Sequence, residues 1–210
     1  MSDLLPLFPL PNVVLFPNVF LPLHIFEPRY RDMIADAIAS DRMIGMVLLR
    51  PGFERDYEGR PPVFPVGCSG VVTHVERLAD GRYNIVLRGV ERFRILQEDH
   101  SRTYRTAVVD ALPERLPAAD DRGIIRQQRS KLEAMLASST DSKSRDPKIP
   151  TAMNDEDLIN ALSQYLSLEP LEKQALLEHH TLRARAEALV ELLEMKLIMS
   201  RTPGLSNVAH

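Results

Sequence analysis

The sequence predicts an α+β protein in which a small β-barrel or closing twisted sheets, with one inserted helix, come before a C-terminal α-helical bundle. Three observations lead to this prediction. Prolines crowd the first third of the chain, short β-type segments with close turns continue to about residue 111, and helical spacing of apolar residues begins after residue 117. We expect a strand-rich domain at 1–115, a helical bundle at 116–202 and a flexible tail at 203–210.

Composition narrows the classes of function. The 210 residues are 44% hydrophobic and 26% charged, which is typical of a globular protein with a sizeable core. The net charge of -3 gives no basic excess, so a nucleic acid is not the expected partner. No apolar run reaches the roughly 18 residues of a membrane span. The single cysteine, Cys68, fits a reducing compartment, and we expect a cytoplasmic protein.

The proline-rich start predicts short, bent or edge strands, because proline donates no backbone hydrogen bond. Apolar stretches at 5–7, 13–16 and 19–21 have the length of buried strands. Asn18 follows Pro17 and suits a turn, since Asn tolerates a positive φ.

One helix interrupts the strands. Pro28 suits its first position, and apolar residues follow at helical spacing to about residue 39. Residues 43–49 form a continuous apolar run, which predicts a buried strand. The polar loop at 50–62 is longer than most connections, and such loops are often functional.

A hairpin gives the clearest β signal. Extended segments at 66–78 and 82–88 flank Asp80-Gly81, the type of pair that favours a tight hairpin turn. We expect Gly89 to turn the chain into a strand at 93–96, with another strand at 104–111.

The second half has helical spacing. Asp120 and Asp121 can cap a first helix, and residues 138–154 are polar and unpatterned, as expected for an interhelical loop. Further helices are expected around 158–166, at 170–178 and from Thr181 to about residue 200. Apolar residues surround much of the last helix, which predicts a central position.

No motif indicates catalysis. The run from Gly67 to Val71 resembles the start of GxSxG but lacks its last glycine, and small residues in a crowded strand explain it better. His179 and His180 lack the spacing of a metal site, and the chain has no phosphate-binding glycine motif. We therefore expect no enzyme activity, no metal and no cofactor.

Two ordered stretches carry a family resemblance. LPLFPLPNVVLFPNVFLPLHIFEPRYRDMI at 4–34 is similar to the opening of the substrate-recognition (N-terminal) domain of the Lon ATP-dependent protease family. GVVTHVERLADGRYNIVLRGVERFRI at 70–95 looks like the hairpin of the same family, with a DGR turn. Asn18 stands where the family commonly has glycine, a mild departure because both residues tolerate the turn.

The resemblance implies a PUA-like barrel with a helical bundle that recognises polypeptide. The chain has no Walker motif and no Ser-Lys protease segment, so the resemblance implies a stand-alone member without peptidase activity. The partner implied is an unfolded polypeptide or another protein, and a weak homodimer is compatible with it.

Candidate contact residues lie in the 50–62 loop. Phe53, Tyr57 and Arg60 are proposed as polypeptide contacts, because aromatic residues and arginine dominate interface energies. Phe53 has the alternative of folding back onto the barrel. Four aromatic residues have a sequence pattern that predicts core positions: Phe16, Phe20, Phe26 and Tyr30.

Two other functions compete with polypeptide recognition. A PUA-like RNA-binding protein is the main alternative, suggested by the barrel class and by many arginines, and it requires binding that weakens steeply with salt. A hydrolase using Ser69 is the third interpretation, and it requires labelling by a fluorophosphonate.

Overall fold

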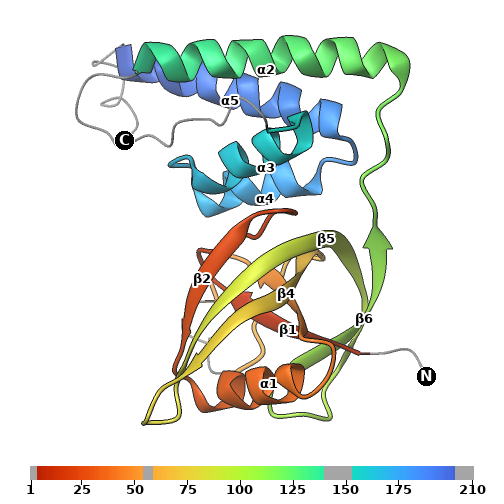
Figure 1. The fold of residues 1–210 in the computed structure, drawn as a ribbon, viewed down its shortest axis with the longest axis vertical. Helices are drawn as coiled ribbons and strands as arrows, with labels where there is room; N and C mark the ends of the chain where they lie inside the picture. Colours follow the sequence, from red (N-terminus) through yellow and green to blue (C-terminus); the bar gives the residue numbers. More distant parts are fainter. Residues whose placement is uncertain (1–3, 54–58, 140–152, 202–210) are drawn as a thin grey trace. The chain divides into compact units, whose positions relative to one another are not determined.

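The computed structural model describes residues 4–53, 59–139 and 153–201. Within them the chain forms an α+β fold, as predicted, with six strands and five helices (Figure 1). The strands are β1 (Leu5–Leu10), β2 (Phe20–Ile25), β3 (Met43–Leu48), β4 (Val66–Arg77), β5 (Tyr83–Asp99) and β6 (Arg105–Leu112). The helices are α1 (Pro28–Ile38), α2 (Ala119–Ser139), α3 (Asp155–Tyr165), α4 (Pro170–Glu178) and α5 (Leu182–Arg201). Tyr57, most of the predicted 138–154 loop and the predicted 203–210 tail lie outside the described residues.

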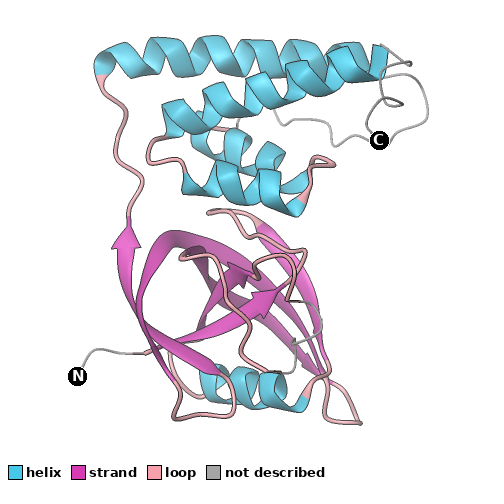
Figure 2. Cartoon of the chain, turned by 180° about the vertical axis from the view of Figure 1, so that it is seen from behind, coloured by secondary structure: helices cyan, strands magenta, loops and turns pink. Residues whose placement is uncertain are grey.

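The strand pairings form a closed ring. The sheet has the order β2-β5-β4-β3-β1-β6, and β6 also pairs with β5. The length of β5 makes this closure possible, because its residues 83–88 pair with β2 and its residues 92–99 pair with β6. The strands therefore curl back on themselves, as two opposite views show (Figures 1 and 2).

Two predicted elements of the first half are confirmed closely. Helix α1 begins at Pro28, and four side chains of its buried face, Tyr30, Met33, Ile34 and Ala37, have the predicted helical spacing. The hairpin between β4 and β5 turns at Gly81, which has a φ of 83° that glycine adopts without steric cost.

The turn predicted at Gly89 is wrong, because β5 runs through this residue without a break. The Gly89 amide donates to the Val19 carbonyl at 2.9 Å, and its carbonyl accepts from the Asn18 amide at 3.0 Å. A Cβ at Gly89 would lie 2.0 Å from the Phe16 carbonyl oxygen. Close approach of two backbones, and not a turn, therefore requires glycine here. Asn18 itself has the predicted positive φ, at 62°.

The strand predicted at 13–16 is also wrong. Val14, Leu15 and Phe16 are buried, but they form no strand. The amide of Phe16 instead donates to the side-chain oxygen of Gln164 at 3.1 Å. A buried side chain thus supplies the hydrogen bond that a neighbouring strand would otherwise supply.

The chain divides into two compact units. The first contains residues 1–114 and 160–178, and the second contains residues 115–159 and 179–210. The first unit holds all six strands, α1, α4 and residues 160–165 of α3. The division falls within α3.

Buried polar side chains tie α4 into the first unit. Gln174 donates to the Val66 carbonyl at 3.0 Å, and Arg92 of β5 donates to the Leu177 carbonyl at 3.2 Å. Both side chains are almost fully buried. Such bonds satisfy backbone carbonyls that would be costly to leave unpaired, so they favour a single position for α4 on the strands.

The second unit is built on α2 and α5. The Thr181 hydroxyl accepts from the Ala184 amide at 3.2 Å, which confirms Thr181 as the cap of α5. Arg183 pairs with Asp121 of α2 at 3.0 Å. Leu182, Ala186 and Leu189 are buried, whereas Met195 is 60% exposed, so burial of α5 is strongest in its first half. Among the described residues, no helix is long and apolar enough to cross a bilayer.

Candidate functional site

The structure describes two of the three predicted contact residues, Phe53 and Arg60. Phe53 is 41% exposed and does not line the cavity that contains Arg60. Tyr57 lies outside the described residues. Of the two described residues, Arg60 lines this cavity, and the candidate site is formed by the residues around it.

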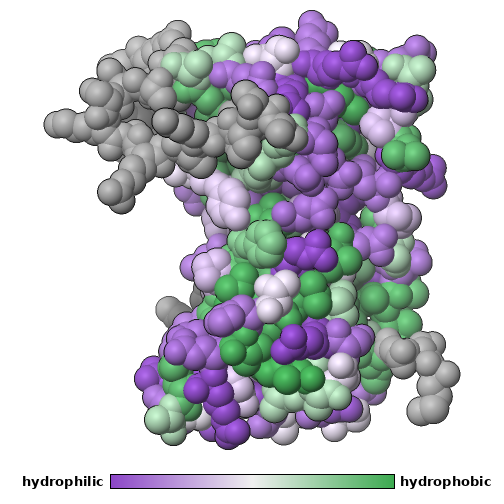
Figure 3. All heavy atoms as spheres, viewed as in Figure 1, coloured by the Kyte–Doolittle hydropathy of each residue, from purple (hydrophilic) through white to green (hydrophobic). Residues whose placement is uncertain are grey.

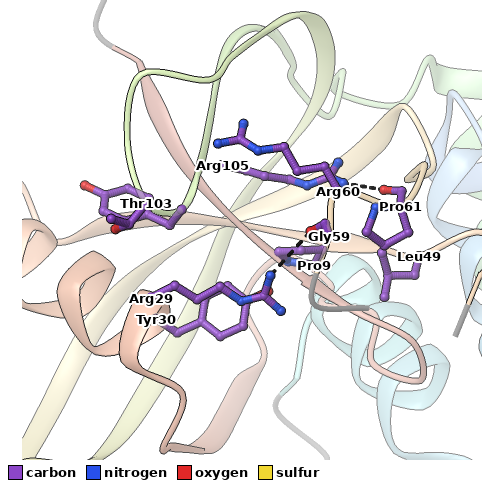
Figure 4. A pocket seen from close by; sticks show the side chains of 10 residues that line it. Pro9, Arg29, Tyr30, Leu49, Gly59, Arg60, Pro61, Thr103 and Arg105 are labelled. Carbon is purple, nitrogen blue, oxygen red and sulfur yellow. Dashed lines mark hydrogen bonds between the residues drawn. The ribbon is translucent and has the colours of Figure 1, made fainter. Parts of the chain in front are cut away.

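Arg60 lines a cavity of about 230 Å³ in the strand-rich unit. Three arginines contribute to its wall: Arg29 from α1, Arg60 from the loop at 50–62, and Arg105 from the start of β6. The other lining residues are Pro9, Tyr30, Leu49, Gly59, Pro61, Thr103 and Tyr104. We call this cavity the arginine pocket. Figure 4 shows side chains from separate elements converging on the segment at 59–61.

Arg105 is the most buried of these arginines. Its guanidinium donates to both carboxylate oxygens of Glu98 at 3.2 Å and to the Pro61 carbonyl. Burial lowers the pKa of Arg105, the Glu98 carboxylate opposes this effect, and the guanidiniums of Arg60 and Arg29 lower the pKa further. The pocket therefore concentrates positive charge in a partly desolvated place.

Arg29 lies in the first turn of α1, where three contacts hold its side chain. Its guanidinium pairs with Glu27 at 3.0 Å, donates to the Gly59 carbonyl at 3.4 Å and lies 4.6 Å from the centre of the Tyr30 ring. Pro28 starts α1 and so sets the direction of Arg29. Arg29 and Arg105 thus donate to the carbonyls at the two ends of the 59–61 segment, Gly59 and Pro61.

Arg60 has a different environment. It donates to a ring nitrogen of His100 and, at 3.1 Å, to the Arg102 carbonyl. Among the residues that the structure describes, no carboxylate forms an ion pair with Arg60. Within the described residues, its charge is therefore less neutralised than the charges of Arg29 and Arg105.

Tyr104 lines the arginine pocket and also a second, wider cavity. Its hydroxyl donates to Asp36 at 2.6 Å, and Arg102 pairs with the same carboxylate at 2.6 Å. Burial and the Asp36 carboxylate raise the pKa of Tyr104 to about 12. The phenol is therefore a neutral hydrogen-bond donor at physiological pH.

The wider cavity has a volume of about 840 Å³. Its apolar lining residues come from the start of the chain and from β1, β3, β5 and β6: Leu4, Leu5, Met43, Phe93, Val109 and Ala111. Asp41 and Glu91 also line it, and within the described residues neither carboxylate forms an ion pair. We call this cavity the apolar groove. Arg92 and Arg102 line it as well, so the groove offers apolar surface beside charges of both signs.

Two aromatic residues predicted to be core are exposed. Phe20 is 51% exposed and Phe26 is 60% exposed, whereas Phe16 and Tyr30 are buried as predicted. Phe20 begins β2, which lies at the end of the strand order and pairs only with β5 in the described sheet. Figure 3 shows apolar side chains gathered on the visible surface of the strand-rich part. Periodicity missed this exposure, because an edge strand alternates in the same way as a central one.

The residues considered for covalent chemistry have structural roles. Cys68 is fully buried, and the Ser69 hydroxyl donates to the Glu91 carbonyl at 3.0 Å across the sheet. A Cβ at Gly67 would lie 2.4 Å from the Met46 carbonyl oxygen, which confirms that small residues fill a crowded strand here. In the described parts of the chain, no group of three or more His, Cys, Asp and Glu side chains could hold a metal ion.

Sequence reasoning selected Arg60 but missed Arg29, Arg105 and the groove. The start of a helix at Pro28 was visible, and it placed Arg29 in the first turn. Nothing in the sequence indicated that the start of β6 would face it, because the two residues are far apart along the chain.

Comparison of sequences gives relatives among Lon proteases. The chain is 27% identical over 210 residues to Lon protease 2 of Myxococcus xanthus, covering 92% of this chain and 24% of the relative. It is 28% identical over 207 residues to the Lon protease of Anaeromyxobacter dehalogenans, covering 91% and 23%. The chain thus spans about a quarter of the length of these relatives.

Solved structures show the same fold. The N-terminal domain of the Mycobacterium avium complex Lon protease matches with a TM-score of 0.66 at 21% identity, over 91% of this chain and 98% of that one. A Lon N-terminal domain protein from Xanthomonas campestris matches with a TM-score of 0.61 at 21% identity, over 90% and 98%. The family model for the ATP-dependent protease La (LON) substrate-binding domain matches residues 4–195. The chain belongs to this family of LON substrate-binding domains.

Proposed function

We propose that the chain is a non-catalytic module that binds unfolded polypeptide. The apolar groove is the observation that supports this function most directly. An unfolded chain exposes apolar side chains that a folded protein buries, and the groove offers apolar surface to receive them. Asp41 and Glu91 add a preference for basic residues in the bound segment. Membership of the LON substrate-binding family points to the same function.

The proposal extends to the architecture and the setting of the module. We infer that the ring of strand pairings is a PUA-like barrel and that the helices after residue 116 form a bundle. We further propose that the protein works in the cytoplasm and that Phe53 and Tyr57 add contacts beside Arg60. The domain limits at 115 and 202 and a weak homodimer stay predictions.

Fluorescence anisotropy with a labelled, reduced and alkylated protein tests the function. We expect binding of this unfolded protein with a dissociation constant of about 1–100 μM, and no binding of its folded form. No binding of the unfolded form at about 100 μM would contradict the proposal. Labelled RNA serves as the competing ligand, and tight, steeply salt-dependent RNA binding would favour the alternative function.

A matched pair of variants locates the binding site. Leu4 lines the apolar groove and is partly exposed, whereas Leu96 is exposed and does not line it. Leu4→Gln should weaken binding by about 1 kcal/mol, or roughly fivefold, because it removes apolar contact area. Leu96→Gln should leave the affinity unchanged. Equal effects of the two variants would place the binding surface elsewhere.

A further inference from the structure

We propose that the arginine pocket binds a carboxylate of the captured polypeptide, either an acidic side chain or the C-terminal carboxylate. This inference rests on the proposed function and adds a chemical preference to it. It assigns to Arg60 the role of direct ligand and to Arg29 and Arg105 the role of shaping the pocket.

Three positively charged side chains line the pocket, and two of them form ion pairs with carboxylates that are not among the described lining residues. Arg29, Arg60 and Arg105 all line it, and none of the lining residues that the structure describes is acidic. Like charges gathered in one cavity repel each other: burial is the main cause of the lowered pKa of Arg105, and the guanidiniums of Arg60 and Arg29 lower that pKa further. A bound anion would relieve it.

A purely structural role explains only two of the arginines. Glu27 and Glu98 neutralise Arg29 and Arg105, and both arginines donate to carbonyls of the 59–61 segment. Arg60 donates hydrogen bonds to His100 and to the Arg102 carbonyl. Neither of these acceptors carries a negative charge at neutral pH. A guanidinium has further N–H groups, so Arg60 can accept a carboxylate in addition.

The size and charge of the pocket favour a single carboxylate. Its volume of about 230 Å³ is below the roughly 300–1,000 Å³ typical of sites for drug-sized ligands, and it fits a side chain or a chain end. Glu27 and Glu98 form ion pairs with Arg29 and Arg105, and Thr103, which lines the pocket, donates to Asp32 at 3.4 Å. These carboxylates would repel a multiply charged anion more than a single charge. The planar guanidinium also matches a carboxylate in geometry.

The shared residue Tyr104 connects the pocket to the apolar groove. One extended segment can therefore place an acidic group near Arg60 and apolar or basic residues in the groove. The two cavities would then recognise opposite charges in one ligand.

Three labelled peptides of identical length test the inference at low salt. One has a central Glu and an amidated C-terminus, the second has Gln at that position, and the third has Gln with a free C-terminal carboxylate. We expect the intact protein to bind the Glu peptide about 3- to 10-fold more tightly than the amidated Gln peptide. Tighter binding of the third peptide would identify the chain end as a ligand as well.

Variants of Arg60 attribute the preference to the pocket. Arg60→Gln should abolish the preference for Glu, and Arg60→Lys should retain part of it. Arg77 is exposed and lines none of the cavities described above, so Arg77→Gln is a control with the same change of charge. Equal affinity of the wild type for the Glu peptide and the amidated Gln peptide would overturn the inference. It would also be overturned if Arg60→Gln and Arg77→Gln lost the preference for Glu to the same extent.

A titration without peptide separates this inference from the proposed function. The Nε–H resonance of Arg60 is followed by NMR while N-acetylglutamate amide, which carries one carboxylate, is added at millimolar concentrations. A saturable shift at Arg60 supports the pocket even if unfolded proteins do not bind. No shift with this compound, or a shift with inorganic phosphate only, would overturn the assignment to a carboxylate.

Discussion

The arginine pocket and the apolar groove share Tyr104 but differ in how their walls are built. Charged side chains held by hydrogen bonds form the pocket, whereas side chains that also belong to the core form much of the groove. Phe93 shows the difference: it packs with Leu7 and Val47 in the core and lines the groove at the same time. Substitutions in the groove should therefore cost stability, and substitutions at the exposed side of the pocket should change selectivity.

Phe93→Ala should give the largest effect. Its ring fills the space above two glycines, since a Cβ at Gly45 or Gly67 would lie 2.8 or 2.7 Å from the ring. Removing the ring should lower the free energy of unfolding by about 3–5 kcal/mol, because a buried cavity remains. Urea unfolding followed by circular dichroism measures this change. Leu96→Ala is the exposed control, and a loss below about 1 kcal/mol for Phe93→Ala would show that the groove is not part of the core.

Arg105→Met should have a smaller effect on stability. It leaves the Glu98 carboxylate and the Pro61 carbonyl without the guanidinium, which should cost about 1–3 kcal/mol in unfolding free energy. The same urea experiment applies, with Arg77→Met as the exposed control. If the two variants unfold at the same urea concentration, Arg105 does not hold the 59–61 segment, and the pocket is built differently.

Tyr104→Phe probes the residue that both cavities share. Loss of the bond to Asp36 should cost about 0.5–1.5 kcal/mol at neutral pH. The folded protein raises the pKa of Tyr104 from 10.0 to about 12, so it holds the phenol proton more tightly than the unfolded chain does. The wild type should therefore lose stability as pH rises from about 10 towards 12, and the variant should lack this loss.

Urea titrations of wild type and Tyr104→Phe at successive pH values test this linkage. The difference in unfolding free energy should be constant below about pH 9 and should shrink above pH 10. A difference that grows at high pH would mean that burial does not favour the neutral phenol.

Glu91→Gln should have the smallest effect, and it acts on binding. Removing one charge at the groove should weaken the affinity for a basic unfolded polypeptide by about 1.5- to 5-fold at low salt. At about 0.5 M salt the effect should vanish, because screening suppresses the interaction. Glu194→Gln makes the same charge change on α5 at a residue that lines neither cavity, and it should leave anisotropy titrations unchanged. A salt-independent loss in Glu91→Gln would indicate a change of packing.

Local signals predicted several elements correctly because they act over a few residues. Pro28 with the apolar spacing after it located α1, Asp80-Gly81 located the hairpin, and Thr181 located the start of α5. The same reasoning failed at residues 13–16, where burial occurs without strand pairing, and at Gly89, where the partner of the glycine is a distant backbone. Both failures depend on contacts that lie far apart in the sequence.

In the candidate site, too, the sequence indicates one residue and only the tertiary structure brings the others to it. Arg60 could be selected from the sequence because it lies in a long polar loop, but Arg29 and Arg105 could not be grouped with it. Exposure of Phe20 was also hidden, because the sequence does not say which strand lies at an edge.

By itself, the sequence determined the α+β order of elements, the positions of most helices and the family resemblance, because propensity, spacing and turn chemistry are properties of neighbouring residues. Only the tertiary structure decided which charges meet and which apolar side chains stay exposed. Closure of the sheet through β5 and β6 brings Arg105 to Arg29 and Arg60, and it sets Phe93 beneath the groove. Long-range strand pairing, rather than local preference, therefore creates both cavities.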